Sequence, residues 1–244
     1  MQFLKSGWQA STSWHRNITD IKGFNTFQRI YLVVIMLTTI MAFIYTGDYS
    51  PAGIASMLTG LALAFYLILL ASGRITNFFW GLLTTGMWFI ISVHNHLIGD
   101  MINQAFFFVM QFVGMYAWQK QLVKQANQTM IESKKLSRPK IGFSIVGAGL
   151  LYFVVLAFAK GGHGNQYYLD SAQLPLGVLA QILATYGYFS SWIVWLAVDA
   201  VGLLLWWNQI QDGGMAAIGM FILMIVKTIN AFYGMYLWAK NPQH

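Results

Sequence analysis

The chain has 244 residues, of which 57% are hydrophobic and only 9% are charged. This composition lies outside the usual range of soluble globular domains and predicts an integral membrane protein. The net charge of +7 then indicates basic residues gathered on cytoplasmic loops, and we expect no nucleic-acid partner. Because the chain contains no cysteine, disulfides, thiolate metal sites and cysteine nucleophiles are excluded.

The N-terminal residues 1–28 are basic and amphipathic. They contain no continuous apolar stretch followed by a small-residue cleavage site, so we expect no cleaved signal peptide. We predict that this segment stays in the cytoplasm and that the first apolar helix after it directs membrane insertion.

Eight segments are apolar enough to cross a bilayer, which takes roughly 20 residues. They lie at about 29–46, 51–71, 77–98, 101–123, 141–160, 174–189, 191–210 and 215–239. Turn residues separate most of them, as at Gly47–Pro51 and Ser72–Arg74. The sixth and seventh segments lack a charged loop between them, yet one helix over both would be far longer than a bilayer is thick. We therefore predict a break at which Gly187 ends one helix and Ser190 or Ser191 caps the next.

Basic residues orient these spans. With the N-terminus inside, twelve of the 14 lysines and arginines lie on the cytoplasmic side, whereas Lys160 falls outside and Lys227 falls within a span. The positive-inside rule therefore predicts a multi-pass protein of the cell (inner, cytoplasmic) membrane with both termini in the cytoplasm.

A short motif occurs twice, as GMYAWQK at residues 114–120 and GMYLWAK at residues 234–240, with five identities in seven positions. Each copy ends a span, which indicates a duplication of three helices. A single linker helix between the copies restores the direction of the chain, so the repeats run parallel, as in the SWEET transporters. The motif itself can also be explained by packing, with glycine allowing close helix approach and tryptophan and lysine anchoring the headgroup region.

The predicted fold class is an all-α integral membrane protein. Two parallel three-helix bundles are joined by a linker helix (3+1+3), and one extra transmembrane helix precedes them. The parts are the N-terminal segment 1–28, the extra helix 29–46, the first repeat 51–123, the basic cytoplasmic loop 124–140, the linker helix 141–160 and the second repeat 174–239. Transporters built from such repeats bind substrate near the bilayer midplane, between the repeats.

Ionisable residues inside two spans are the strongest functional signal. Asp199 lies near the middle of its span, where a carboxylate costs on the order of 3 kcal/mol and needs a partner or a watered cavity. Trp192, Trp195 and Trp206 share its helix face. Lys227 lies at a similar depth in the last span, and we expect it to pair with Asp199. The pair fits either a structural link that sets the register of two helices or the wall of a substrate path, and both can hold together.

Amides and aromatic residues extend this set in both repeats. Gln104, Gln111 and Trp118 recur at intervals of seven on one helix. A mid-span glutamine serves either as a hydrogen-bonding link between helices or as a ligand. The candidate substrate-binding residues are Trp192, Trp195, Asp199, Lys227, Asn230, Tyr233, Gln104, Gln111, Trp118 and Asn208. Such a set suits a neutral or delocalised aromatic solute with hydroxyl groups.

Signatures of enzymes do not occur in the sequence. It contains no HExxH, GxSxG or phosphate-loop motif. His94 and His96 are two residues apart, which points them to different helix faces, so we expect no metal site. We predict that the chain is not an enzyme, uses no cofactor and cannot power a pump alone.

These motifs together resemble the PnuC family of nicotinamide riboside transporters. The resemblance covers roughly residues 51–240 and rests on W-x-x-W-x-x-x-D at Trp192, Trp195 and Asp199, on G-D-x-x-x-Q at Gly99, Asp100 and Gln104, and on G-x-Y-x-W at Gly114–Trp118 and Gly234–Trp238. It implies a 3+1+3 core, a homotrimer in the lipid membrane, and uptake of nicotinamide riboside by facilitated diffusion. Phosphorylation inside the cell would then trap the solute.

Nicotinamide riboside also suits the chemistry of these residues. Its pyridinium ring can stack on Trp195 or Trp192, which is worth about 0.5–2 kcal/mol, while amides such as Asn230 reach its hydroxyls or carboxamide. An unpaired Lys227 would repel this cation, so we expect Asp199 or a hydrogen-bond network to offset its charge.

Other functions remain open at this stage. Within transport, the solute can be another vitamin, such as thiamine or riboflavin, or a sugar. In a different class, the protein is a membrane scaffold that transports nothing, in which Asp199 and Lys227 only lock the helices together.

Overall fold

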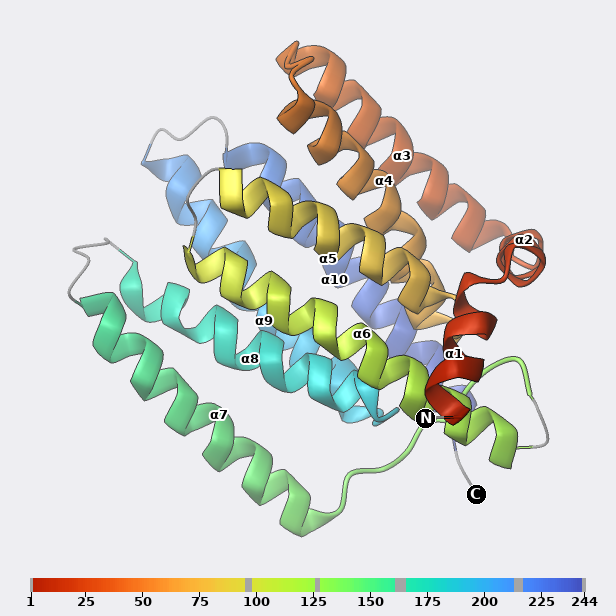
Figure 1. Cartoon of the computed structure of the whole chain (residues 1–244). Helices are drawn as coiled ribbons and strands as arrows, with labels where there is room; N and C mark the ends of the chain where they lie inside the picture. Colours follow the sequence, from red (N-terminus) through yellow and green to blue (C-terminus); the bar gives the residue numbers. More distant parts are fainter. Residues whose placement is uncertain (1, 95–97, 126–127, 161–165, 213–216, 243–244) are drawn as a thin grey trace. The chain divides into compact units, whose positions relative to one another are not determined.

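The computed structural model describes residues 2–94, 98–125, 128–160, 166–212 and 217–242. Over these ranges the chain forms ten α-helices, two isolated backbone bridges and no β-strand (Figure 1). The all-α class is as the sequence predicts, and α1 and α2 are additional to the eight predicted helices. The helices are α1 (Gln2–Thr12), α2 (Trp14–Lys22), α3 (Thr26–Thr46), α4 (Pro51–Ala71), α5 (Asn77–His94), α6 (Ile98–Lys124), α7 (Arg138–Ala159), α8 (Tyr167–Thr185), α9 (Ser190–Gln211) and α10 (Ala217–Lys240). They belong to two compact units, Met1–Ile131 with α1–α6 and Glu132–His244 with α7–α10.

Each of the eight predicted spans coincides with one of the helices α3–α10, with ends that differ by several residues. Five helical segments are long and apolar enough to cross a membrane: Thr26–Thr46, Gly53–Ala71, Arg138–Ala159, Ser190–Gln211 and Met220–Lys240. α5 is apolar over a shorter stretch, Asn77–Val93. α6 and α8 carry buried amides, Gln104, Gln111 and Gln181, which lower their apolar content. Length and composition alone therefore identify five of the eight helices as membrane spans.

α3 ends and α4 begins at the predicted turn residues, whereas the start of α3 at Asn25 was not predicted. Asn25 caps α3 in a capping box with Gln28, and Gly47 ends the helix in the left-handed conformation, with φ of 61°. Ser50 then caps α4 by accepting from the backbone N–H of Gly53, and Pro51 takes the first helical position. Each residue stands where helix ends favour its type, so the local sequence accounts for this connection.

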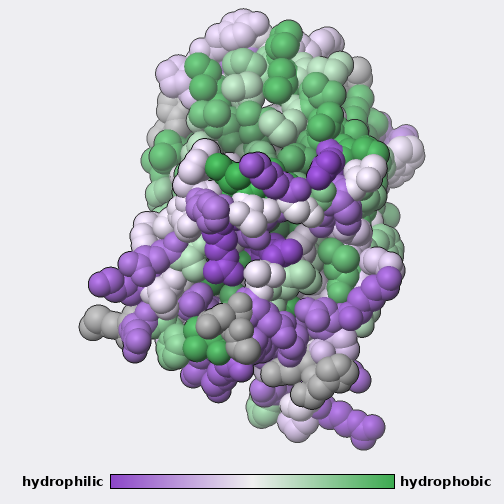
Figure 2. Space-filling model, turned by 90° about the vertical axis from the view of Figure 1, so that its right-hand side faces the viewer, coloured by the Kyte–Doolittle hydropathy of each residue, from purple (hydrophilic) through white to green (hydrophobic). Residues whose placement is uncertain are grey.

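The outer surface of α3 is apolar. It exposes Ile30, Val33, Leu37, Met41 and Ile44. In Figure 2, hydrophobic side chains gather toward the top of the visible face, which is where α3 and α4 lie in Figure 1, and hydrophilic ones gather below. A helix of 21 residues with such a surface meets the requirements of a lipid-facing span.

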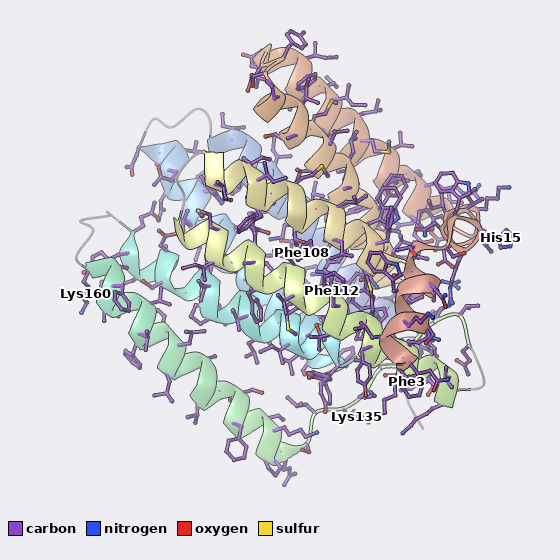
Figure 3. The ribbon with its side chains drawn as sticks, viewed as in Figure 1. Phe3, His15, Phe108, Phe112, Lys135 and Lys160 are labelled. Atoms are coloured by element: carbon purple, nitrogen blue, oxygen red, sulfur yellow. The ribbon has the colours of Figure 1, made fainter. Side chains whose placement is uncertain are left out.

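The N-terminal segment folds as two short helices, the first of which packs on α6. Trp8 of α1 stacks on Phe112 of α6, with ring centroids 6.1 Å apart and planes 9° apart. Figure 3 labels Phe112 on α6 and Phe3 on α1. At Gly7 the helices approach so closely that an added Cβ would lie 2.5 Å from the carbonyl oxygen of Met115. One side of the amphipathic segment therefore rests on the protein itself.

α2 is held by polar contacts to α5 and to the turn before it. The Nε1–H of Trp80 donates to Asn17 Oδ1 at 3.0 Å, and the hydroxyl of Thr76 donates to Asp20 Oδ2 at 2.7 Å. Asp20 also lies 3.5 Å from the guanidinium of Arg74. Asn17 and Asp20 are both buried, so these bonds supply the partners that buried polar groups require.

The connection between α8 and α9 breaks where the sequence predicts, but its capping differs. Gly187 has a φ of 75° and follows the end of α8. The predicted serine cap is wrong: Phe189 takes the N-cap position, and Ser190 and Ser191 lie inside α9. The backbone N–H of Phe189 donates to the carbonyl oxygen of Lys134 at 2.9 Å. A distant loop segment thus accepts one N–H at this helix start, while the N–H groups of Ser191 and Trp192 donate to the nearby carbonyls of Tyr188 and Phe189.

Each unit contains a glycine against which an aromatic ring packs. In the first unit, a Cβ added to Gly114 would meet the ring of Phe78, which lies edge-on to Trp118 at 4.8 Å and 74°. In the second, a Cβ added to Gly234 would lie 2.5 Å from the ring of Trp192, which lies edge-on to Trp238 at 5.5 Å and 84°. The predicted role of the motif's glycine in close packing is therefore confirmed. The predicted role of its tryptophan as a headgroup anchor is not, because Trp118 and Trp238 are both buried against these rings.

We predict that Gly234→Ala destabilises the protein, because the added methyl group would overlap the Trp192 ring. Overpacking of this kind costs about 1–3 kcal/mol. The matched control is Gly147→Ala in α7, where no atom lies within 4 Å of an added Cβ. Both changes gain the same helix propensity, so thermal unfolding of the two variants in one detergent isolates the overlap. Equal unfolding temperatures would contradict the tight packing at Gly234.

Candidate functional site

Asp199 of α9 and Lys227 of α10 form an ion pair inside the second unit. The Lys227 Nζ atom lies 3.4 Å from Asp199 Oδ1, which confirms the predicted pairing. The Asp199 side chain is 2% exposed and the Lys227 side chain is 23% exposed. Neither charge stands alone in the apolar interior, where an unpaired charge would be costly.

Lys227 is the outer member of this pair. Besides Asp199, its Nζ atom lies 3.9 Å from the sulfur of Met224, one turn earlier on α10. The ion pair leaves Asp199 Oδ1 without a well-aligned hydrogen bond among the described residues. The Asp199 carboxylate is thus paired with one ammonium, and its Oδ1 atom can still accept a hydrogen bond from a ligand or water.

Three helices of the second unit approach one another beside the pair, at Gly202. A Cβ added to Gly202 of α9 would lie 2.7 Å from Met224 Sδ and 3.1 Å from Gln173 Nε2 of α8. Gln173 is not among the residues predicted from the sequence. α8 also buries Gln181 and Ser171. The sequence could have indicated Gln173, because a glutamine inside an apolar helix is the same feature that indicated Gln104 and Gln111 on α6.

The two tryptophans of α9 differ in their surroundings. Trp192 is buried against Gly234 and Trp238, so its ring is part of the helix packing. Trp195 is half-buried, and its Nε1–H has no acceptor among the described residues. Trp195 lies four residues before Asp199, on the same helix face. The Nε1–H of Trp192 also has no acceptor among the described residues, so the two differ in exposure, and Trp195 is the one with ring surface left for a ligand.

Of the remaining predicted residues of the second unit, two lie on the helix face of the Asp199–Lys227 ion pair and one lies far from it. Asn230 is buried and follows Lys227 by three residues, so it shares the face of the pair, and Tyr233 is half-buried one turn further. Asn208 is exposed and donates to Gln166 Oε1 at 2.9 Å. It lies nine residues beyond Asp199, about 13 Å along the helix. Asn208 therefore ties α9 to the start of α8 and is not brought to the ion pair.

The first unit holds the predicted amides and one tryptophan on α6. Gln111 is buried, its Nε2 donates to the carbonyl oxygen of Phe107 at 3.2 Å, and its Oε1 faces Gly81 without a donor among the described residues. Gln104 is also buried. Trp118 packs on Phe78 and serves the helix packing. His96 and the side chains of His94 and Asp100 lie outside the described residues.

The ion pair has no equivalent in the first unit. If Phe78 is matched to Trp192 and Gly114 to Gly234, the offsets of 114 and 120 residues match Asp199 to Thr85 and Lys227 to Phe107. The hydroxyl of Thr85 donates to the carbonyl oxygen of Gly81 at 2.8 Å. The same positions therefore carry charge in one unit and none in the other.

Over the residues that the structure describes, no group of three histidine, aspartate or glutamate side chains could hold a metal ion. The arrangement in the second unit instead offers a half-buried indole, a carboxylate, an ammonium and amides. These groups can bind an organic solute through stacking, charge and hydrogen bonds.

We predict that Asp199→Asn and Lys227→Met each destabilise the protein, because each leaves one charge unpaired in the apolar interior. The double variant should lose less than the sum of the two, with a coupling free energy of about 1–3 kcal/mol. Thermal unfolding of the four proteins in one detergent measures this coupling. Additive losses would contradict a stabilising interaction between the two side chains.

Comparison with known sequences identifies relatives along almost the whole chain. The sequence model of a family described as nicotinamide mononucleotide transporter matches residues 50–240. A protein of Haemophilus influenzae named nicotinamide riboside transporter PnuC is 24% identical over 223 residues, covering 90% of this chain and 92% of the relative. A protein of Neisseria mucosa with the same name is 22% identical over 234 residues, covering 93% and 85%.

A solved structure has the same fold. The crystal structure of the vitamin B3 transporter PnuC matches with a TM-score of 0.72 and 21% identity, and the match covers 94% of this chain and 97% of that one. The family match covers well over half of the chain, and five of its helices are long and apolar enough to span a membrane. The chain therefore belongs to the PnuC family of multi-pass membrane transporters and not to a family of enzymes.

Proposed function

We propose that this protein transports nicotinamide riboside across the cell membrane. The observation that carries the proposal is the face of α9 on which a half-buried Trp195 with an unpartnered Nε1–H lies one turn from the buried carboxylate of Asp199. A cationic aromatic ring can stack on the indole while the carboxylate favours its charge. The names of the relatives, which are nicotinamide riboside transporters, support the same solute.

Amides complete the proposed recognition. Asn230 lies on the face of the ion pair, and Gln173 lies beside Gly202. Both can hydrogen-bond to ribose hydroxyls or to the ring carboxamide. Gln111 and Gln104 of the first unit are the corresponding donors and acceptors there, and the unpartnered Oε1 of Gln111 supports a role as ligand.

We propose transport by facilitated diffusion. The sequence contains no ATP-binding motif, which supports transport that is not driven by ATP hydrolysis. In this proposal the solute moves down its own gradient, and phosphorylation inside the cell maintains that gradient by trapping the solute.

We further propose a 3+1+3 arrangement of parallel repeats, as in SWEET transporters, in which α4–α6 and α8–α10 are the repeats, α7 is the linker and α3 is the extra helix. The glycine–aromatic packing that occurs in both units supports it. Transport would then proceed by rocking of one repeat against the other. The domain limits predicted from the sequence stand as part of this proposal.

We propose an inner-membrane location with both termini in the cytoplasm, which the distribution of basic residues supports. A homotrimer in lipid is the proposed assembly. α7 supports contact with lipid or with other subunits, because Phe143, Phe153 and Phe158 are exposed along it.

The description of the matching family favours a second solute, nicotinamide mononucleotide, which carries a phosphate that the riboside lacks. Lys227 is the group that could attract this phosphate. Thiamine, riboflavin, a sugar and a scaffold without transport remain as outcomes of the test below.

We predict that purified protein binds nicotinamide riboside in calorimetry and that Trp195→Ala weakens this binding about 3- to 30-fold, which corresponds to the loss of one cation–π contact. Trp207→Ala is the matched control, because Trp207 lies on the same helix, is exposed and contacts Phe221. The mononucleotide, thiamine, riboflavin and ribose are tested beside the riboside. Binding of thiamine alone would leave the fold assignment intact and show that nicotinamide riboside is not the solute. Binding of none of the solutes would favour a scaffold without transport.

We also predict that protein in liposomes equilibrates radiolabelled nicotinamide riboside without accumulating it. With the membrane potential held at zero, a protonophore should leave the initial rate unchanged, because facilitated diffusion of a cationic solute depends only on its own electrochemical gradient. Empty liposomes are the control for leakage. Accumulation above the external concentration at zero membrane potential, in the presence of an ion gradient, would show coupled transport and contradict this mechanism.

A further inference from the structure

The N-terminal helices α1 and α2 turn polar groups toward the protein and tryptophan rings outward. Asn17 and Asp20 of α2 are buried, whereas Trp14 of the same helix is 76% exposed. Trp8 of α1 is 45% exposed although its ring stacks on Phe112. Tryptophan favours such positions where one side of the ring meets protein and the other meets the headgroup layer of a membrane.

The exposed charges of this segment are all positive. Residues 2–46, which the structure describes throughout, contain a single acidic residue, Asp20, and it is buried. Lys5, Lys22 and Arg29 are exposed. Basic side chains beside exposed tryptophans are the pattern of helices that lie on anionic membrane surfaces.

Asp20 does not neutralise the basic groups around it. Its carboxylate lies 3.5 Å from the guanidinium of Arg74. The pKa of the half-buried Arg16 is lowered, chiefly by burial, while nearby Asp20 raises it and nearby Arg74 lowers it further. One carboxylate therefore lies near two guanidinium groups, which leaves this cluster with a net positive charge that an anion can balance.

α2 lies where the chain enters the membrane. Only residues 23–25 separate α2 from α3, which has the apolar surface of a lipid-facing span. In Figure 1, α2 is seen nearly end-on whereas α3 and α4 run across the view, so α2 lies across the direction of these spans. A helix joined to a span by so short a connection, and turned across it, lies along the membrane surface.

We propose that α1 and α2 form a binding surface for anionic phospholipids of the cytoplasmic leaflet. The lipid phosphates lie against Lys5, Arg16 and Lys22, and the rings of Trp8 and Trp14 lie in the headgroup layer beside them. Because α1 stacks on α6 and α2 is bonded to α5, lipid bound here stabilises the folded first unit. The surface lies before the matched family region of residues 50–240, and the inference holds for any solute.

The test is thermal unfolding of the full-length protein in nanodiscs of phosphatidylcholine, and in nanodiscs in which part of this lipid is replaced by phosphatidylglycerol. We expect phosphatidylglycerol to raise the unfolding temperature of the wild type at low salt, and molar salt to remove the rise. Lys5→Gln/Lys22→Gln should lose about half of the rise, because both lysines are exposed members of the surface. Lys135→Gln/Lys160→Gln is the matched control, since both lysines are exposed outside the segment, and it should keep the rise.

A second measurement tests the location of α2. Because the chain contains no cysteine, Trp14→Cys takes a single fluorophore at an exposed position. A quencher attached to the lipid headgroups should quench this fluorophore, and absence of quenching would show that α2 lies away from the membrane and overturn the inference.

Equal unfolding temperatures of the wild type in the two lipid mixtures overturn the inference. A rise that Lys5→Gln/Lys22→Gln keeps in full, or that the control variant loses to the same extent, overturns it too, because the effect would then come from other basic residues or from net charge alone. None of these outcomes bears on the proposed function, which binding of the riboside decides.

Discussion

The ion pair between Asp199 and Lys227 is the interaction on which the second unit depends. A carboxylate on a membrane helix needs an opposite charge, and the one available within reach is on α10. Their separation of 3.4 Å therefore fixes how α9 and α10 can slide and rotate against each other. The same contact places Trp195, Asn230 and Gln173 around one region of the unit, so a single electrostatic requirement orders both the packing and the candidate site.

The helices of the two units pack through the same glycine–aromatic contact, and the two units differ in the charged residues at matched helix positions. In each, a glycine of the G-M-Y-x-W motif lets an aromatic ring of the preceding helix approach, and the tryptophan four residues later meets that ring edge-on. At the positions of Asp199 and Lys227 the second unit carries an acid and a base, where the first has Thr85 and Phe107. The duplication therefore conserves the means of helix association, while the chemistry that can distinguish solutes is concentrated in one copy.

The N-terminal helices add a further layer to the first unit. They lie before the matched family region of residues 50–240. Their apolar contact at Trp8 and their polar contacts at Asn17 and Asp20 reach α6, α5 and the turn before α5. Because Asn17 and Asp20 are buried and bonded, this segment is part of the folded unit and more than a basic tail at the membrane surface.

The class of the protein, the approximate positions of α3–α10 and the pairing of Asp199 with Lys227 could be predicted from the sequence alone. These follow from composition, from the length that a bilayer demands and from the cost of a charge in an apolar medium, all of which depend on local sequence. Tertiary structure decided which candidates lie near the pair. Trp192 and Trp118 pack between helices, and Asn208 lies toward the far end of α9. Gln173, which was not predicted, lies beside Gly202 near the ion pair. At the start of α9, Phe189 and not a serine takes the N-cap position, and its backbone N–H donates to the carbonyl oxygen of Lys134. Helix rotation and contacts between distant segments produce these outcomes, and periodicity along one helix carries no information about either.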